Sequence, residues 1–188
     1  VERNLIDVRT YSVGLLHVGA LVACYFGTQQ TTPNRHGQPV YGGSSLTVAR
    51  GGFESLEQMA GADADLSRAV ALARIYHSAA LSCFTGMFAS RANYDIVQGR
   101  DAAGQVVAAV LEQSWRIGGA SGAEVAALQA LSDDPSLETV RARTVEIHAP
   151  NVSVPDGATL YFSGVDEHVG PITKYAQVLR HAHTRAED

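Results

Sequence analysis

The feature that most constrains this chain is a long stretch near its start without formal charge. Residues 10–34 contain no Arg, Lys, Asp or Glu, and residues 13–26 are almost continuously apolar. Such a segment must be buried, because its exposure to water would cost roughly 25 cal/mol per Å² of apolar surface. Periodicity does not distinguish a buried helix from a strand pair in so short a run. Its length favours a helix, although one of about 21 Å is shorter than the roughly 30 Å core of a membrane.

A second uncharged stretch, residues 75–90, lies within the most strongly predicted helix. Asp63 or Asp65 can cap the start of this helix by accepting a backbone hydrogen bond. Apolar residues between positions 66 and 87 then recur with a heptad-like spacing. The opposite side is also lined with apolar side chains, and a helix that is apolar all round must be buried on all sides.

Turn-forming residues predict the other elements before position 135. Residues 28–52 are rich in Gly and Pro and predict a linker, in which a small hairpin around Gly42 and Gly43 is compatible with the sequence. Residues 101–117 predict a third helix. A capping box formed by Ser121 and Glu124 predicts a short helix through Leu131.

The last part of the chain has a different character. Asp134 and Pro135 resemble the start of another helical turn. Short strands are expected at residues 145–148, 152–154 and 159–162, and Pro171 is expected to open a terminal helix. Residues 119–188 carry ten acidic and five basic side chains, so the whole net charge of −5 lies here.

These patterns together predict a mostly α fold, with oligomerising hydrophobic helices and a small β or irregular C-terminal arm. Three segments are expected: residues 1–52 as the hydrophobic N-terminal helix and linker, 53–134 as a helical core, and 135–188 as an acidic strand-and-loop arm with its terminal helix. The basic residues are scattered singly, which argues against a nucleic-acid partner.

Glycine-rich and cysteine-containing segments are candidate sites of chemistry. Residues 118–122, Gly-Gly-Ala-Ser-Gly, are expected to follow a helix and therefore to be a connecting loop, because a phosphate-binding loop follows a strand. Cys24 and Cys83 lie in apolar runs and predict buried, reduced thiols. No sequence motif of a hydrolase or a zinc site is present, so no catalytic residue, cofactor or metal ligand is predicted.

Histidines were the other candidates. His17 and His77 are each the lone ionisable group in a predicted apolar helix and could face a haem or metal, but a hydrogen-bonded packing role is the simpler interpretation. The sequence leaves open whether they bind a cofactor. Asp166, Glu167 and His168 are expected in a solvated loop, and His181 and His183 in a last helical turn.

The excess of apolar surface on the predicted helices favours association with other chains. We therefore predict a homo-oligomer that depends on partner chains and has no enzymatic activity of its own. The expected interaction residues are the larger apolar side chains of the two uncharged stretches: Leu15, Leu16, Val18, Leu21, Val22, Phe26, Leu66, Val70, Leu81, Phe84, Met87 and Phe88.

This layout of apolar helix, linker, second apolar helix and acidic arm resembles the scaffold subunit of the actinobacterial high-affinity uptake nickel–iron hydrogenase. The resemblance covers the whole chain but no diagnostic motif. It implies a cofactor-free subunit of a membrane-associated redox complex, whose helices form a hydrophobic conduit for quinone and whose C-terminal part holds the catalytic protein subunits. The reduced thiols indicate a cytoplasmic location, and the resemblance implies a peripheral position at the inner face of the membrane. The alternative is a small helical protein or enzyme that binds haem, flavin or a lipophilic ligand.

Overall fold

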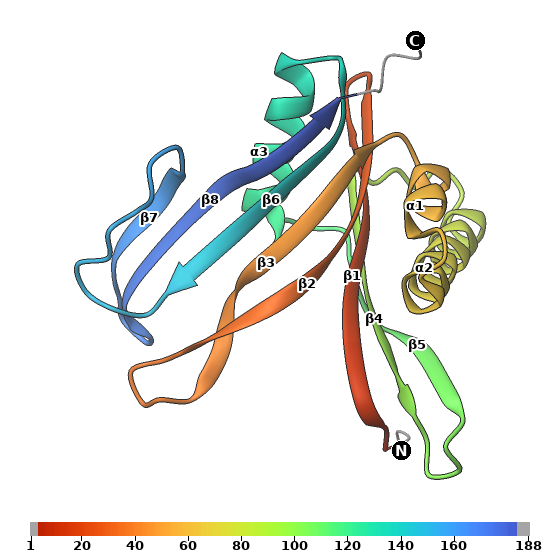
Figure 1. Cartoon of the computed structure of the whole chain (residues 1–188), viewed down its shortest axis with the longest axis horizontal. Helices are drawn as coiled ribbons and strands as arrows, with labels where there is room; N and C mark the ends of the chain where they lie inside the picture. Colours follow the sequence, from red (N-terminus) through yellow and green to blue (C-terminus); the bar gives the residue numbers. More distant parts are fainter. Residues whose placement is uncertain (1–3, 184–188) are drawn as a thin grey trace. The chain divides into compact units, whose positions relative to one another are not determined.

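The structure is a computed structural model that describes residues 4–183. Within this range the chain forms eight strands and three helices. The strands hydrogen-bond to one another in the order β5-β4-β1-β2-β3-β6-β8-β7, as an antiparallel sheet. The prediction of a mostly α fold is therefore wrong, and the fold is mostly β (Figure 1).

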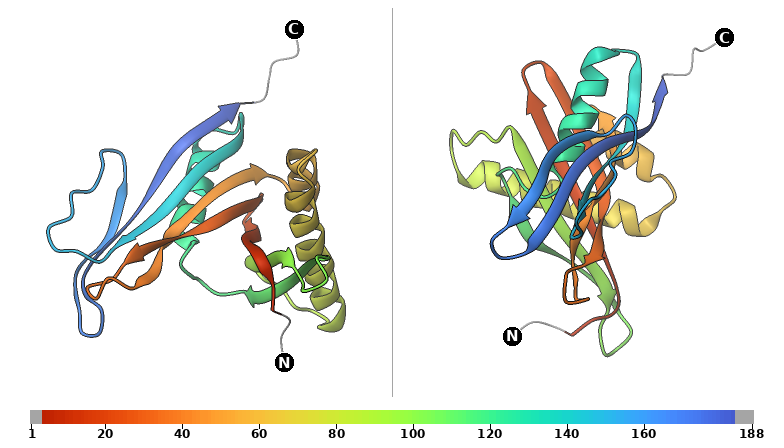
Figure 2. Two further views of the ribbon diagram at one scale, coloured as in Figure 1. Left: turned by 60° about the horizontal axis from the view of Figure 1, so that its bottom comes forward. Right: turned by 90° about the vertical axis from the view of Figure 1, so that its left-hand side faces the viewer.

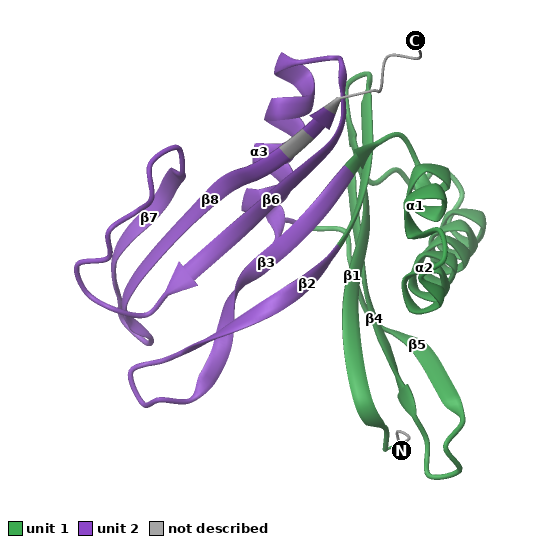
Figure 3. Cartoon of the chain, in the orientation of Figure 1, with its two compact units in different colours: residues 1–26, 49–116 green, residues 27–48, 117–188 purple. Residues whose placement is uncertain are grey.

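The chain divides into two compact units (Figure 3). Unit 1 comprises residues 1–26 and 49–116, and unit 2 comprises residues 27–48 and 117–188. The strands β2 (Leu21–Pro33) and β3 (Pro39–Arg50) contribute residues to both units.

Unit 1 places two helices on one face of its strands (Figure 1). Its other strands are β1, β4 and β5, and β4 pairs with both of its neighbours. The bounds are β1 (Ile6–Val18), β4 (Arg91–Arg100), β5 (Val106–Ser114), α1 (Phe53–Ala60) and α2 (Ala64–Cys83).

The core of unit 1 lies between these helices and alternate residues of the strands. Leu56, Val70 and Tyr94 are fully buried there. Tyr94 and Ile96 of β4 point to the helices, so Asn93 and Asp95 must point to the other face, because side chains alternate along a strand. This alternation decides which residues form the candidate site.

Unit 2 packs one helix against two long strands (Figure 2). The helix α3 (Ser121–Asp133) lies on β6 (Leu137–Ile147) and β8 (Gly170–His183), and β7 (Thr159–Asp166) pairs with β8. Leu131 and Val140 are fully buried in this unit.

The first uncharged stretch forms strands rather than the predicted helix. Residues 10–26 contain most of β1, a turn at Gly19 and the start of β2. Gly19 takes a positive φ of 59°, which glycine adopts readily. Residues 12–16 are all buried, so both faces of β1 are covered there. A strand buried on both faces loses the polar alternation by which strands are recognised, which explains the error.

The predicted linker and third helix are also strands. Residues 28–52 contain the end of β2 and all of β3, with a turn at residues 34–38 in which Asn34 Oδ1 accepts hydrogen bonds from two backbone N–H groups. Residues 101–117 contain a second turn, held by Asp101 Oδ1, and then β5. Both turns contain a glycine with positive φ, at Gly37 and Gly104.

Several predictions for the last third need correction as well. The terminal helix from Pro171 is instead the strand β8, and residues 152–154 form no strand. The strand expected at residues 159–162 is confirmed as part of β7, and that at 145–148 lies largely in β6. The helix opened by Ser121 exists but lacks the capping box, because its N-cap is Ala120 and makes no side-chain bond.

The helix over residues 64–83 is confirmed. Asp63 is its N-cap, and the side chain accepts hydrogen bonds from the backbone N–H groups of Asp65 and Leu66. The uncharged stretch continues beyond the helix, which ends before Phe84. The prediction of membrane-associated apolar helices is contradicted by the mostly β fold. In residues 4–183 no helix is both long and apolar enough to cross a membrane.

Candidate functional site

A group of polar side chains occupies the face of unit 1 that points away from α1 and α2. We call it the polar face and define it as Ser12, Tyr25, Asn93, Asp95, Glu112 and Ser114. The register of the strands brings these residues together: Ser12 of β1 pairs with Asp95, and Asp95 pairs in turn with Glu112 of β5. Asn93 pairs with Ser114 one step along.

Hydrogen bonds orient the carboxylate of Asp95. Ser12 Oγ donates to Asp95 Oδ1 at 2.7 Å, and Asn93 Nδ2 donates to the same oxygen at 3.1 Å. Asn93 is itself held by Tyr25, whose hydroxyl donates to Asn93 Oδ1 at 2.8 Å. Asn93 and Ser12 are buried, and Tyr25 is completely so. The Asp95 carboxylate is thus fixed by a buried network rather than left to rotate.

Gly14 makes this network sterically feasible. It lies on β1 opposite Asn93, and the aromatic ring of Tyr25 occupies the space that a Cβ at position 14 would fill. Because glycine has no side chain, the Tyr25 hydroxyl can reach Asn93 across β1.

Two carboxylates lie opposite each other at the centre of the polar face. Asp95 is half-buried and Glu112 is exposed. Directly paired residues on antiparallel strands have Cβ atoms about 4.5–5.5 Å apart, and like charges in such a pair destabilise the sheet. An arrangement of this kind favours the binding of a cation between the two groups.

A β-bulge lies next to the pair. Asp95 pairs with Glu112 but Ile96 pairs with Val110, which leaves Leu111 as the extra residue on β5. Bulges bend a strand and redirect side chains, and they are frequent next to active sites. Here the bulge is at the position that sets the direction of Glu112.

The end of β5 is held by the guanidinium of Arg91. This side chain is buried, and its Nη1 donates to the carbonyl oxygens of Ser114 and Arg116, at 3.2 and 2.6 Å. It also lies 3.3 Å from Ser114 Oγ. The hydroxyl of Ser114 is therefore placed on the same face as Glu112, two residues away, by contacts that do not involve a ligand.

The protein supplies few metal-binding groups in one place. Among the residues that the structure describes, no three His, Cys, Asp or Glu side chains come together in a group that could hold a metal ion. Any cation on the polar face would therefore have two carboxylates from the protein and would take its other ligands from hydroxyls, water or a second ligand.

The predicted histidine candidates lie on the helix side of unit 1. His77 Nδ1 is 2.9 Å from the Tyr94 hydroxyl, and its ring packs against Phe53. Burial, followed by the nearby His17, lowers the pKa of His77 from its ordinary value. His17 makes an edge contact with Phe88. His77 thus has a hydrogen-bonded packing role, and the side chains of His181 and His183 lie outside what the structure describes.

The predicted interaction residues separate into three sets by exposure. Leu15, Leu16, Leu66 and Val70 are buried. The half-buried members are Leu21, Val22, Phe26 and Met87. Four are exposed, namely Val18, Leu81, Phe84 and Phe88, with Phe88 at 77%.

The remaining candidates have structural roles. Asp166 Oδ1 accepts hydrogen bonds from the backbone of Val169 and His168 in the β7–β8 turn, and these bonds lower the pKa of Asp166. Cys24 is buried, which raises the pKa of its thiol to about 12. Cys83 is exposed, so the prediction that both thiols are buried is wrong for this residue.

The glycine-rich loop follows the strand β5 and precedes α3, so the prediction that it follows a helix is wrong. Its glycines serve close packing. A Cβ on Gly119 would meet the ring of Tyr41, and one on Gly122 would meet Thr144 and Tyr161. Ser121 Oγ accepts a hydrogen bond from the N–H of Gly118, which closes the turn before the helix.

The polar face was not predicted from the sequence. A signal for it exists, because Asn93 and Asp95 alternate with the apolar Ala92, Tyr94 and Ile96. Such alternation indicates a strand with one polar face. Residues 112–114 are all polar and show no such alternation, and the prediction of a helix over residues 101–117 concealed the strand that carries them.

These features define a β-rich protein of two units whose candidate site lies on strands rather than between helices. The chain belongs to the family described as "Protein of unknown function (DUF3182)", whose family model matches residues 1–176. No curated protein and no solved structure shows significant similarity. None of these findings bears on the resemblance to a hydrogenase subunit, and the helical layout that suggested it is absent from residues 4–183.

Proposed function

We propose that unit 1 binds a divalent cation of the Mg²⁺ type together with a phosphate-bearing ligand, on the polar face. The observation that carries this proposal is the cross-strand pairing of Asp95 with Glu112, combined with the network that fixes the Asp95 carboxylate.

The donor atoms favour a hard cation. The polar face offers carboxylate and hydroxyl oxygens, and none of its six members is a His or a Cys. Oxygen ligands suit Mg²⁺, Ca²⁺ and Mn²⁺, whereas imidazole and thiolate ligands suit zinc and copper.

The number of carboxylates favours a second ligand. Mg²⁺ in proteins typically keeps several waters and is held by one or two carboxylates together with the phosphates of a substrate. Asp95 and Glu112 match this number. Two carboxylates leave several coordination positions of the ion to water, and phosphate oxygens can fill some of them, so both ligands should bind better together than alone.

The supporting hydrogen bonds fit this role. Ligating carboxylates are usually oriented by hydrogen bonds from outer groups, and the loss of such a group typically weakens metal binding 10–100-fold. Ser12 and Asn93 occupy that position relative to Asp95.

Calorimetric titration tests the proposal. Mg²⁺ is titrated into the protein with and without inorganic pyrophosphate, for the natural sequence, Asp95→Asn and Glu112→Gln. Glu167→Gln is the control, because Glu167 is an exposed carboxylate in a unit 2 loop. We expect binding that pyrophosphate strengthens, a loss of at least 10-fold in both site variants, and no change in the control. Equal affinity in all four proteins would refute the proposal.

A second candidate function is that of a non-catalytic subunit that forms homo-oligomers and holds other proteins. The observation that favours it is the exposure of Ile75 on α2 and of Phe84 and Phe88 beyond its end, at 65%, 60% and 77%. Contiguous exposed apolar surface marks protein interfaces, and these side chains are the candidates for such a surface. Light scattering on the natural sequence and on Phe84→Ser/Phe88→Ser tests it, and a monomer in both cases would exclude self-association through this surface.

A further inference from the structure

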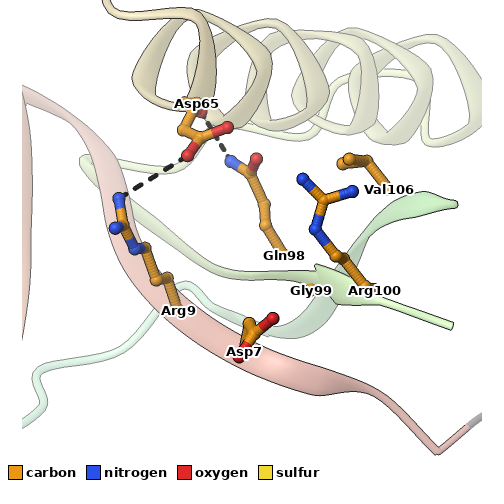
Figure 4. Close-up of a pocket in the computed structure, with 7 residues that line it drawn as sticks. All are labelled: Asp7, Arg9, Asp65, Gln98, Gly99, Arg100 and Val106. Atoms are coloured by element: carbon orange, nitrogen blue, oxygen red, sulfur yellow. Dashed lines mark hydrogen bonds and ion pairs between the residues drawn. The ribbon is translucent and has the colours of Figure 1, made fainter. Parts of the chain in front are cut away.

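A small pocket that is open to solvent lies on the helix side of unit 1, at the end of the sheet near the start of α2, and its Asp7, Arg9 and Arg100 are exposed (Figure 4). Its volume is about 170 Å³. We call it the Asp7 pocket. Five of its lining residues are Asp7 and Arg9 of β1, Asp65 of α2, and Gly99 and Arg100 of β4.

The backbone around Asp7 is irregular in a way that opens the pocket. In the pairing of β1 with β4, Ile6 is opposite Arg100 and Arg9 is opposite Gln98, so two residues of β1 face Gly99 alone. Asp7 takes a positive φ of 53° at this bulge. That conformation is uncommon for a residue other than glycine, and Asp tolerates it better than most.

Gly99 permits the close approach of β1 at the bulge. A Cβ at position 99 would lie 2.9 Å from the carbonyl oxygen of Ile6 and 3.0 Å from Leu5 Cβ. Any larger residue would push β1 away and alter the pocket. The strained backbone and the close contact thus both position Asp7, which is a pattern found at functional sites.

The charged residues of the pocket differ in how many hydrogen bonds and ion pairs they form. Asp65 forms ion pairs with Arg9 at 3.6 Å and with Arg68 at 3.1 Å, so its charge is balanced. Arg100 donates one hydrogen bond, from Nη1 to the carbonyl of Gly104, which leaves other donors of its guanidinium available. Asp7 forms no hydrogen bond or ion pair with another side chain in residues 4–183, Arg100 included.

We propose that the Asp7 pocket binds a small zwitterion of the α-amino-acid class. The Asp7 carboxylate accepts the ammonium group of the ligand, and Arg100 binds the carboxylate with its free guanidinium donors. Guanidinium and carboxylate groups pair through two parallel hydrogen bonds, which gives this end of the pocket its directionality.

The size and the net charge of the pocket agree with this ligand class. A water molecule takes about 30 Å³ in the liquid, so the cavity has the volume of roughly five or six waters. Drug-sized ligands and whole cofactors need about 300–1,000 Å³. Two acidic and two basic side chains line the pocket, so a neutral molecule with separated charges is matched better than a simple anion or cation.

This pocket is independent of the polar face, because it lies on the opposite side of the same strands. Gln98, next to Gly99 on β4, hydrogen-bonds to α2, whereas Asp95 points away from the helices. Loss of one site should therefore leave the other intact.

The test is an NMR titration of the ¹⁵N-labelled protein with L-alanine, alongside acetate and ethylamine as half-ligands. We expect L-alanine to shift the amide signals of Gly99 and Arg100, and each half-ligand to bind at least 10-fold more weakly. Asp7→Asn, which also tolerates positive φ, and Arg100→Gln should each weaken L-alanine binding about 10–100-fold, since each removes a charge-assisted hydrogen bond. Arg35→Gln, in the exposed β2–β3 turn, is the matched control and should bind like the natural sequence.

Three results would overturn the proposal. These are the absence of L-alanine binding, equal binding of acetate and L-alanine, and unchanged affinity in both site variants. Retained Mg²⁺ binding in Asp7→Asn would confirm that the variant is folded and that the two sites are separate.

Discussion

Replacing Glu112 by Gln is expected to stabilise the ion-free protein and to abolish its stabilisation by Mg²⁺. Without an ion, Glu112 lies directly opposite Asp95. Like charges in that position destabilise a sheet by roughly 0.2–1 kcal/mol. Gln has nearly the shape of Glu and no charge, so the repulsion disappears. For a protein of this length, 1 kcal/mol corresponds to about 2–4 °C in melting temperature.

With bound Mg²⁺ the natural sequence is expected to be more stable than Glu112→Gln. A ligand present at 100 times its Kd stabilises the folded state by about 2.7 kcal/mol. This corresponds to a rise of about 5–11 °C in the melting temperature of the natural sequence. In Glu112→Gln the rise should be small, because one of the two protein carboxylates is missing.

Thermal unfolding followed by circular dichroism measures both effects. Each protein is melted in EDTA and in Mg²⁺ with pyrophosphate, at matched ionic strength, so that general salt screening does not contribute. The control Glu167→Gln should behave like the natural sequence in both buffers. Suppose that Glu112→Gln has the same melting temperature as the natural sequence in EDTA, and that Mg²⁺ with pyrophosphate raises both melting temperatures equally. The two carboxylates then neither repel each other nor share an ion.

Three further substitutions test other parts of the account. Gly14→Ala should lower the free energy of unfolding in urea by about 1–3 kcal/mol or more, because its Cβ would overlap the ring of Tyr25; an unchanged value would contradict the close packing. Asp63→Ala should lower the free energy of unfolding by about 1 kcal/mol, because the N-cap of α2 is lost. Asp63→Asn is its control, because Asn can also cap a helix, and it should be close to the natural sequence in stability. The lowered pKa of His77 means that folding favours its neutral form, so its contribution to stability is present above the ordinary pKa and is lost as pH falls through the lowered one. His77→Gln should therefore lose less stability than the natural sequence between pH 7 and pH 5, and parallel losses would show that His77 is not responsible.

The part of the fold that the sequence predicts correctly is the part with local signals. The helix over residues 64–83 has a capping Asp at its start and no Gly or Pro within it. Residues 13–26 have no such signal, since strands buried on both faces are apolar at every position. Residues 106–110 are mostly Val and Ala, which occur in both strands and helices, and only the turn at residues 101–105 indicates the hairpin.

The candidate site was not predictable from individual residues. Asp95 and Glu112 are ordinary acidic residues in the sequence, and their relation arises from the register of β4 with β5. That register includes a bulge, which shifts the pairing by one residue. A pairing of strands is a long-range property, so no local pattern specifies which carboxylates meet.

The position of a bound paramagnetic ion shows whether Asp95 and Glu112 share a divalent cation. Mn²⁺ is added in small amounts to the ¹⁵N-labelled protein in the presence of pyrophosphate, because Mn²⁺ takes the same oxygen ligands as Mg²⁺ and broadens the amide signals nearest to it. The account predicts that residues 93–95 and 112–114 are broadened first, and that Glu112→Gln removes the effect. Broadening that begins at the Asp7 pocket or among the acidic residues of unit 2, or that persists in Glu112→Gln, would contradict it.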